Sequence, residues 1–149
     1  MPQIDSETLA FAHRLADAAG EVIRPYFRRP IDVSDKGAAK GADFDPVTQA
    51  DRGAEEALRA IIQAERPQDA ILGEEFGETE GTSGRRWVLD PVDGTRAFIT
   101  GHHMWGTLIA LEEDGERESW GSSISQCCAN ASSAIRDARK LFPRRALRP

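Results

Sequence analysis

The sequence predicts an α/β protein in which helices are layered against a sheet. Two segments, residues 5–27 and 48–65, carry apolar residues at helical spacing, and three short apolar segments at 70–73, 87–89 and 106–111 are typical of strands. Acidic residues follow two of these strands directly. Ligands of α/β sheets bind beyond the carboxyl ends of strands, so this pattern also predicts where a site lies.

The chain has 149 residues, which is enough for one domain with its own hydrophobic core. Its residues are 40% apolar and 30% charged. No apolar run approaches the roughly 20 residues that span a bilayer, and the first residues lack the basic and apolar regions of a secretory signal. Cys127 and Cys128 are adjacent and do not make a disulfide framework. We therefore expect a cytoplasmic protein with no membrane partner.

Charge is distributed unevenly along the chain. The net charge of −6 argues against a general nucleic-acid binder, so no nucleic-acid partner is expected. Residues 1–114 have 12 Lys and Arg against 22 Asp and Glu, whereas residues 115–149 have 7 against 3. This change of sign predicts two segments of different role that meet near residue 114.

The first helix is expected over residues 5–27, with Asp5 or Ser6 as its N-cap. Residues 31–46 contain three glycine or proline breaks and several small polar residues, which indicates a loop. Lys36 lies in this loop. A lysine there can approach a phosphate, and a solvated lysine on the surface is the alternative.

The second helix, over residues 48–65, has an apolar face that includes Ala54, Leu58 and Ile62. Asp51 falls in its first turn, where the helix dipole favours an acid. A purely structural role for Asp51 therefore stays open beside a role in a site.

Two of the predicted strands end in acidic residues. The first runs directly into Glu74, and residues 87–89 run into Asp90. Pro91 cannot donate to a β-ladder, so the second strand is expected to end near it, with Asp90 and Asp93 at its mouth. The recurrence of strand and acid indicates one shared site, and exposed acids in ordinary loops are the alternative.

Gly94 allows a tight turn after Asp93, and residues 95–99 are expected to form a short helix. Two fixed acids would then lie beside backbone N–H groups at a helix start, which suits a divalent cation together with a phosphate. An ordinary Asp-Pro and Asp-Gly turn is the alternative. Phosphatases that form an aspartyl-phosphate are excluded, because Pro91 stands where that class has its nucleophilic aspartate.

Beyond this central motif, residues 106–111 predict a strand and residues 112–115 a hairpin turn. No return strand is expected, because residues 116–126 lack both alternation and an apolar run. Residues 127–142 are expected to form a weak helix before a basic end with three arginines. The whole segment 115–149 is thus predicted to be poorly ordered or weakly helical.

Three sequence blocks together resemble the inositol monophosphatase family, whose members are metal-dependent, lithium-sensitive phosphomonoesterases. The blocks are Asp45-Pro-Val-Thr-Gln-Ala-Asp51, Gly73-Glu-Glu-Phe76 and Trp87-Val-Leu-Asp-Pro-Val-Asp-Gly-Thr95. They follow the family's order and approximate spacing. Finer similarity to the histidinol-phosphatase branch lies at residues 44–48, 94–99 and 105–109. The resemblance covers residues 1 to about 114, and it implies the N-terminal, metal-binding portion of the family's layered αβαβα fold.

The resemblance implies a site with two or three Mg²⁺ ions. Glu74, Asp90 and the Val92 carbonyl would hold the first ion, and Asp90 and Asp93 would hold the second. Glu74 would also contact a third, more weakly bound ion.

The resemblance also implies catalytic and phosphate-binding roles. Asp51 and Thr95, with Glu74, would be catalytic, and the first two would orient and deprotonate the attacking water. The N–H groups of Gly94 and Thr95, together with Lys36, would bind the phosphate. The implied substrate is a small phosphate monoester of histidinol phosphate or inositol phosphate type, and the implied assembly is a homodimer.

Elementary electrostatics supports the same assignment. Two carboxylates about 4 Å apart repel by roughly 4 kcal/mol at an effective dielectric constant of about 20. Several acids therefore gather only where cations lie between them, and oxygen ligands favour Mg²⁺ or Mn²⁺ over Zn²⁺. Direct attack by water needs no covalent intermediate, and no Ser-His or Cys-His pair is visible to supply one.

The sequence departs from the family at two places. Gly101-His-His-Met104 stands where close relatives have Leu-Pro, and we interpret its histidines as loop substitutions. Nothing after Asp114 resembles the family's second half, so we expect a truncated fold with a basic tail from a shifted reading frame. Such a chain is a metal-dependent phosphatase, an inactive remnant that at most binds metal weakly, or a subunit completed by another chain.

Overall fold

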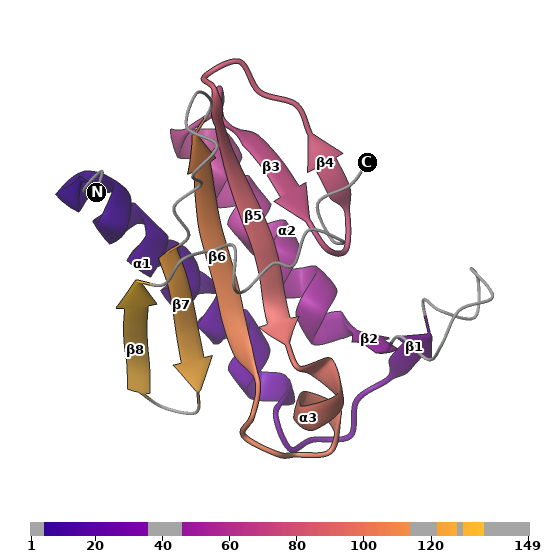
Figure 1. Cartoon of the computed structure of the whole chain (residues 1–149). Helices are drawn as coiled ribbons and strands as arrows, with labels where there is room; N and C mark the ends of the chain where they lie inside the picture. The colour runs from indigo at the N-terminus through magenta and orange to yellow at the C-terminus, as the bar shows by residue number, and fades with distance from the viewer. Residues whose placement is uncertain (1–4, 36–45, 114–121, 128–129, 136–149) are drawn as a thin grey trace.

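The computed structural model describes residues 5–35, 46–113, 122–127 and 130–135 (Figure 1). Figure 1 shows α1 and α2 on one face of a central sheet, which is the layered α/β arrangement that the sequence predicts. Within the described ranges, every helix is too short or too polar to cross a membrane.

The central sheet has the strand order β4-β3-β5-β6. Its strands are β3 (Ala70–Gly73), β4 (Gly77–Thr79), β5 (Arg85–Asp93) and β6 (Gly106–Glu113). β3 and β5 are parallel, whereas β4 and β6 run antiparallel to their neighbours. The carboxyl ends of β3 and β5 therefore meet at one edge of the sheet.

Helix α1 (Ser6–Ile23) begins at the predicted cap, where the Asp5 carboxylate accepts a hydrogen bond from the Thr8 N–H at 2.7 Å. The α-helix ends at Ile23, short of the predicted end at residue 27, and a 3₁₀ turn, η1 (Arg24–Tyr26), follows it. Pro25 explains the change, because proline has no N–H with which to continue the α-helical ladder.

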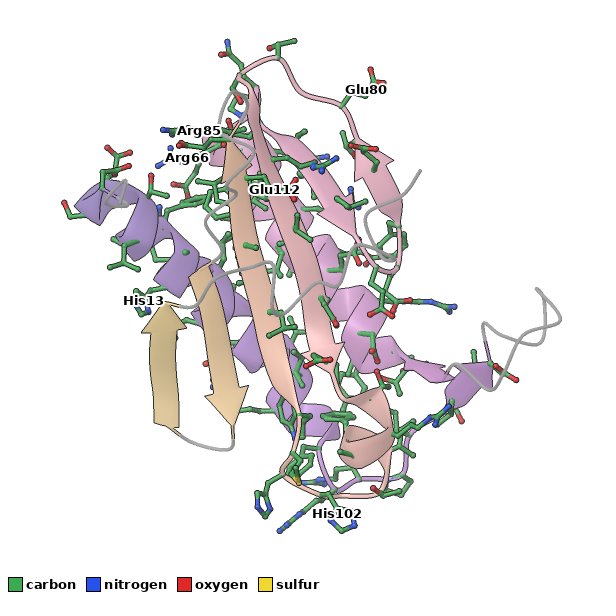
Figure 2. All side chains as sticks on the ribbon, viewed as in Figure 1. His13, Arg66, Glu80, Arg85, His102 and Glu112 are labelled. Carbon is green, nitrogen blue, oxygen red and sulfur yellow. The ribbon has the colours of Figure 1, made fainter. Side chains whose placement is uncertain are left out.

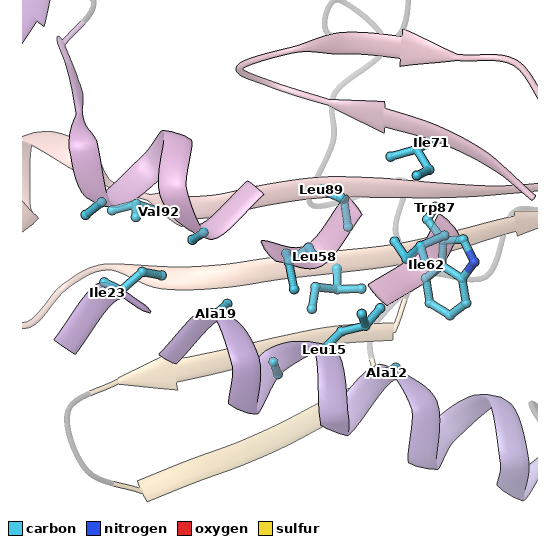
Figure 3. Packing of buried hydrophobic residues seen from close by; sticks show 14 of the residues in the cluster. Ala12, Leu15, Ala19, Ile23, Leu58, Ile62, Ile71, Trp87, Leu89 and Val92 are labelled. Carbon is cyan, nitrogen blue, oxygen red and sulfur yellow. The ribbon is translucent and has the colours of Figure 1, made fainter. Parts of the chain in front are cut away.

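Helix α2 (Gln49–Glu65) confirms the second predicted helix, with Thr48 as its N-cap. Its apolar face packs with α1 against strands β3 and β5, and Figure 3 shows this layer from close by. The buried residues labelled there are Ala12, Leu15, Ala19, Ile23, Leu58, Ile62, Ile71, Trp87, Leu89 and Val92. Fully burying one Leu or Ile side chain contributes about 1.5–3 kcal/mol, so this layer fixes the sheet from which the acids project.

Helix α3 (Thr95–Ile99) is anchored by three aromatic side chains. The rings of Phe98 and Trp105 meet edge to face, with centroids 5.0 Å apart, and Phe27 lies 5.5 Å from each of them. This cluster holds the start of α3 beside the end of β5.

The structure corrects the loop expected over residues 31–46. Strand β1 (Val33–Asp35) pairs antiparallel with strand β2 (Pro46–Thr48). All three residues of β1 are exposed. The strand therefore lacks the alternation of buried and exposed positions by which a strand is predicted from sequence. Lys36 belongs to residues 36–45, which lie outside the described residues.

The structure also corrects the region after β6. Strands β7 (Ser122–Cys127) and β8 (Asn130–Ile135) form an antiparallel pair, and β7 lies beside β6 (Figure 1). A strand does return, and the weak helix expected over residues 127–142 is wrong at 130–135. Serine and asparagine disfavour helices because their side chains compete with the helical backbone hydrogen bonds. The domain boundary predicted near residue 114 stays a prediction.

Candidate metal centre

Strand β5 carries both aspartates of the central motif to the edge of the sheet. Its ladder with β6 is regular up to Asp90 and resumes at Asp93 after a shift in register. Within this stretch the Thr107 hydroxyl donates to the Pro91 carbonyl at 2.8 Å. The strand therefore continues to Asp93 instead of ending near Pro91, because the register shift accommodates the missing N–H of proline.

Glu74 is the first residue after β3, in the turn that leads to β4. Gly73 pairs with Leu89 in the parallel ladder, and the Glu74 N–H donates to the Leu89 carbonyl at 3.2 Å. Glu74 and Asp90 therefore leave neighbouring strands at the same level.

Asp51 comes from the first turn of α2, and only 1% of its surface is exposed. Its Oδ2 accepts hydrogen bonds from the Thr48 hydroxyl and from the Thr48 N–H, the latter at 3.0 Å. Its Oδ1 lies 3.3 Å from the Thr95 hydroxyl, which in turn lies 2.9 Å from the Val92 carbonyl. A structural capping role alone does not account for Asp51, because its carboxylate also contacts the start of α3.

Glu74, Asp90, Asp93 and Asp51 are here called the acid cluster, because the other three all act on the pKa of Asp90. Burial, followed by the charges of Glu74 and Asp93, raises the pKa of Asp90 to about 9, and a hydrogen bond to Glu74 and the charge of Asp51 add to this. Burial and the Glu74 charge raise the pKa of Asp93. Burial also raises the pKa of Asp51, although hydrogen bonds from its cap residue lower it. Such effects require short distances, so the structure places Glu74, Asp93 and Asp51 near Asp90.

The acid cluster extends from solvent into the interior. Glu74 and Asp93 are exposed, Asp90 is half-buried and Asp51 is buried. The Asp90 Oδ1 atom is itself buried, and no group of the described residues donates a hydrogen bond to it. An unpartnered buried carboxylate oxygen is costly, and a hard cation satisfies it. Because the side-chain donors of the cluster are all oxygens, the residues fit Mg²⁺ or Mn²⁺.

The acids do not yet form a complete ligand set. Among the residues that the structure describes, no group of three or more His, Cys, Asp or Glu side chains is arranged to hold a metal ion. Asp90 and Glu74 are instead joined by a hydrogen bond between their carboxyl groups. Such a bond needs a proton on one partner, so in this arrangement a proton offsets charge that a cation would otherwise offset.

The turn between β5 and α3 requires glycine. Gly94 has φ +84°, and a Cβ atom there would lie 2.7 Å from the Met104 carbonyl oxygen. The Gly94 N–H, expected to face a phosphate, forms a hydrogen bond to Asp93. Thr95 begins α3 directly after this turn. The third predicted phosphate ligand, Lys36, lies outside the described residues.

Glu55 is a buried residue near the site that the sequence interpretation missed. Its carboxylate accepts hydrogen bonds from the N–H groups of Glu75 at 2.7 Å and Phe76 at 3.2 Å, just after Glu74. The sequence does contain a pattern that indicates its place. Glu55 stands four residues after Asp51 and between the apolar residues of α2, and residues four apart share one helix face.

The histidines lie elsewhere. His102 and His103 are exposed in the segment after α3, which agrees with their interpretation as loop substitutions. Figure 2 shows His13 on α1 and His102 beyond α3, on different sides of the molecule.

Comparison with known proteins gives a consistent result. The model of the inositol monophosphatase family matches residues 5–137. The chain is 47% identical over 108 residues to a histidinol-phosphatase of Chlorobaculum parvum, and 50% identical over 109 residues to a chloroplastic bifunctional phosphatase of Arabidopsis thaliana. It is also similar to the solved structure of an inositol monophosphatase from Zymomonas mobilis, with 42% identity and a TM-score of 0.60.

The matched region is a larger share of this chain than of each relative. Each curated relative matches 72% of this chain, and the chain spans 40% of the length of the first and 30% of the second. The solved structure matches 90% of this chain, which covers 53% of that structure. The family match also continues past residue 114, where the resemblance was expected to stop.

Proposed function

The chain belongs to the inositol monophosphatase family, and we propose that its acid cluster is the metal site of a phosphomonoesterase. The single observation that carries this proposal is the buried Asp90 Oδ1 atom, which has no hydrogen-bond donor among the described residues, and the raised pKa of Asp90 agrees with it. Crowded carboxyls with strongly shifted pKa values are typical of functional sites. The proposed reaction is the hydrolysis of a small phosphate monoester by water.

We assign the metal ligands as Glu74, Asp90, Asp93 and the Val92 carbonyl, for two or three Mg²⁺ ions with Mn²⁺ as a substitute. The buried, unpartnered Asp90 Oδ1 supports this assignment. When bound, the ions supply a lowered pKa of the attacking water and compensation for the negative charge of the phosphoryl oxygens. The chain contributes by fixing these oxygens where β3 and β5 end.

Asp51 and Thr95 would orient the attacking water and accept its proton, with Glu74 as the third catalytic residue. The Thr95 hydroxyl has one proton, which it donates to Asp51 or to the Val92 carbonyl. When it donates to Asp51, its oxygen is available to accept a hydrogen bond from water, and a proton taken from that water is balanced by transfer of the hydroxyl proton to Asp51. The raised pKa of Asp51 favours the same direction of transfer, because it makes this carboxylate a stronger base.

We assign phosphate binding to the N–H groups of Gly94 and Thr95 and to Lys36. The Gly94 N–H bonds to Asp93 in the structure, so this role requires that bond to break. A cation on Asp93 would favour the change, because it competes with the N–H for the carboxylate.

Histidinol phosphate is the favoured substrate. Three histidinol-phosphatases, from Chlorobaculum parvum, Mycobacterium tuberculosis and Streptomyces coelicolor, are 42% to 47% identical to the chain. An inositol phosphate is the alternative, supported by the Zymomonas mobilis structure. By analogy with the family we also propose that the protein is a homodimer. We propose a cytoplasmic location for it. Residues 1–114 and residues 115–149 are proposed to have distinct roles.

A second candidate function is metal binding without turnover, by the chain alone or as a subunit completed by another chain. The observation that favours it is the share of the relatives' length, 40% for the Chlorobaculum parvum enzyme. A substrate pocket needs several walls, and residues 1–149 correspond to only part of the relative that has one.

Phosphate release from histidinol phosphate and from inositol 1-phosphate, with and without Mg²⁺, tests the first candidate. We expect release that depends on Mg²⁺ and is abolished by Asp93→Asn. Release that is independent of metal would contradict the proposal. Calorimetric titration with Mn²⁺ in the absence of substrate separates the candidates, because binding without turnover supports the second one.

A further inference from the structure

Helix α2 carries a buried ion pair. Glu55 is fully buried, and Arg59, one helical turn later, is 9% exposed. The Arg59 Nε atom donates to the Glu55 Oε1 atom at 2.8 Å. A buried ion pair alone adds little stability, because removing two charges from water offsets their attraction. The remaining contacts of the pair therefore indicate its role.

The Glu55 carboxylate contacts the chain on both sides of Glu74. Its Oε2 and Oε1 atoms accept the N–H groups of Glu75 at 2.7 Å and Phe76 at 3.2 Å. On the other side, a Cβ atom built on Gly73 would lie 1.8 Å from Oε1. Glycine is thus needed immediately before Glu74 so that the carboxylate can approach the backbone this closely.

Arg59 connects the ion pair to β4, the strand that follows the turn after β3. It donates to the Thr79 hydroxyl at 2.9 Å and to the Gly77 carbonyl, both in β4. The Glu74 N–H is bound to the Leu89 carbonyl of β5. Hydrogen bonds to α2 on one side and to β5 on the other therefore hold the main chain around Glu74 in place.

We propose that Glu55 is a positioning residue that sets the place of the metal ligand Glu74 relative to Asp51. The proposal rests on the metal site proposed above. Asp51 and Glu55 lie one turn apart on the same face of α2, so Asp51 reaches the site directly and Glu55 acts through the turn after β3. The helix thereby fixes the separation of two acids that come from different parts of the chain.

Binding of Mn²⁺ alone to the 149-residue chain, measured by titration calorimetry, tests this inference. Glu55→Gln replaces one accepting oxygen by an amide NH₂ group, which cannot accept a hydrogen bond from a backbone N–H. We expect the Kd for Mn²⁺ to rise about ten-fold, as is typical when a group that orients a metal ligand is changed.

Two control variants on the same helix separate positioning from other effects. Glu56→Gln makes the same chemical change at the adjacent, exposed position, and we expect an unchanged Kd. Ile62→Val weakens the buried face of α2, and we expect a lower melting temperature with an unchanged Kd. Equal weakening of Mn²⁺ binding by Glu55→Gln and Ile62→Val would overturn the inference, because the effect would then follow stability.

The parent chain separates this inference from the proposed function. A parent chain that does not bind Mn²⁺ overturns both, whereas a parent that binds and a folded Glu55→Gln variant that binds equally well overturn only the role of Glu55. Glu55→Asp withdraws the carboxylate from the turn and keeps its charge, and we expect it to weaken Mn²⁺ binding as well. Loss of the folded circular dichroism spectrum in both variants would also overturn the inference, because Glu55 would then act on the whole fold.

Discussion

The two ends of strand β5 differ in how charge is compensated. At its first end, Arg86 contacts Glu112 of β6 at 2.5 Å and Glu78 of β4 at 3.1 Å. Arg85 contacts Glu113 at 2.8 Å. Figure 2 shows Arg85 and Glu112 together at this end of the sheet. Each of these carboxylates has a cationic partner on β5.

At its second end, β5 brings carboxyls against carboxyls. The largest influences on Asp90 are its burial and the charges of Glu74 and Asp93, and all of them raise its pKa. No cationic side chain of the described residues is among these influences on Asp90, so a proton or a cation from solution would compensate its charge. The contrast teaches that the first end of β5 is an ordinary charged surface, whereas the second gathers carboxyls, as the proposed metal site requires.

The largest expected effect comes from Asp90→Asn. The variant removes the charge on which the proposed metal ions depend, so we expect Mn²⁺ affinity to fall about 100-fold or more. At pH 8 the metal-free parent must take up a proton on Asp90 in order to fold, whereas asparagine needs none, so the variant should be more stable by about 1 kcal/mol or more. Titration calorimetry and urea unfolding measure the two quantities. If Asp90→Asn bound Mn²⁺ as tightly as the parent chain, the proposed difference between the two ends of β5 would be wrong.

The stability of the metal-free chain should depend on pH through Asp90. Its pKa is about 9 in the folded chain and 3.8 for the unperturbed group, so the folded state holds the extra proton between these values. Unfolding then releases a proton, and stability falls as the pH rises through this window, by up to about 1.4 kcal/mol per pH unit.

Urea unfolding at pH 5 and pH 8 measures this dependence. We expect lower stability at pH 8 without metal and recovery on addition of Mg²⁺, which binds the folded state. Asp90→Asn should flatten the profile, since it removes the group that titrates. An equal stability at both pH values in the parent chain would contradict the prediction.

Gly94→Ala tests the backbone at the second end. Alanine disfavours φ +84°, and its Cβ would lie 2.7 Å from the Met104 carbonyl oxygen. We expect a loss of about 1–3 kcal/mol in unfolding free energy. Gly77→Ala is a matched control, because Gly77 has φ +71° but no atom within 4 Å of its Cβ position. If Gly77→Ala loses less unfolding free energy than Gly94→Ala, the difference is due to the close approach of the Cβ atom to the Met104 carbonyl oxygen.

Much of this arrangement was predictable because burial leaves a periodic pattern. The apolar faces of α1 and α2 and the apolar strands repeat at regular spacing, and the parallel pairing of β3 with β5 carries Glu74 and Asp90 to one edge. Glu74 directly follows β3 and Asp93 ends β5, so the convergence of the acids at this edge follows from the fold.

The remainder depends on contacts that leave no local pattern. All three residues of strand β1 are exposed, so no alternation of buried and exposed positions predicts it. Pro91 predicted the end of β5, but β5 has one residue more than β6 between Asp90 and Asp93, and this register shift lets the strand continue past the proline. The role of Glu55 depends on backbone N–H groups about 20 residues away, and backbone donors are the same for almost every sequence.

The smallest expected effect lies at the first end of β5. Glu112→Gln removes one partner of Arg86, but Glu78 still compensates the guanidinium charge. We expect a loss of at most about 1 kcal/mol in urea unfolding, which shrinks in about 0.5 M salt because partly exposed pairs are screened. The Kd for Mn²⁺ should not change, since the substitution lies at the opposite end of the strand from the acid cluster. A change in that Kd comparable to the effect of Asp90→Asn would mean that the two ends are coupled through β5, and their separation into surface and site would then be wrong.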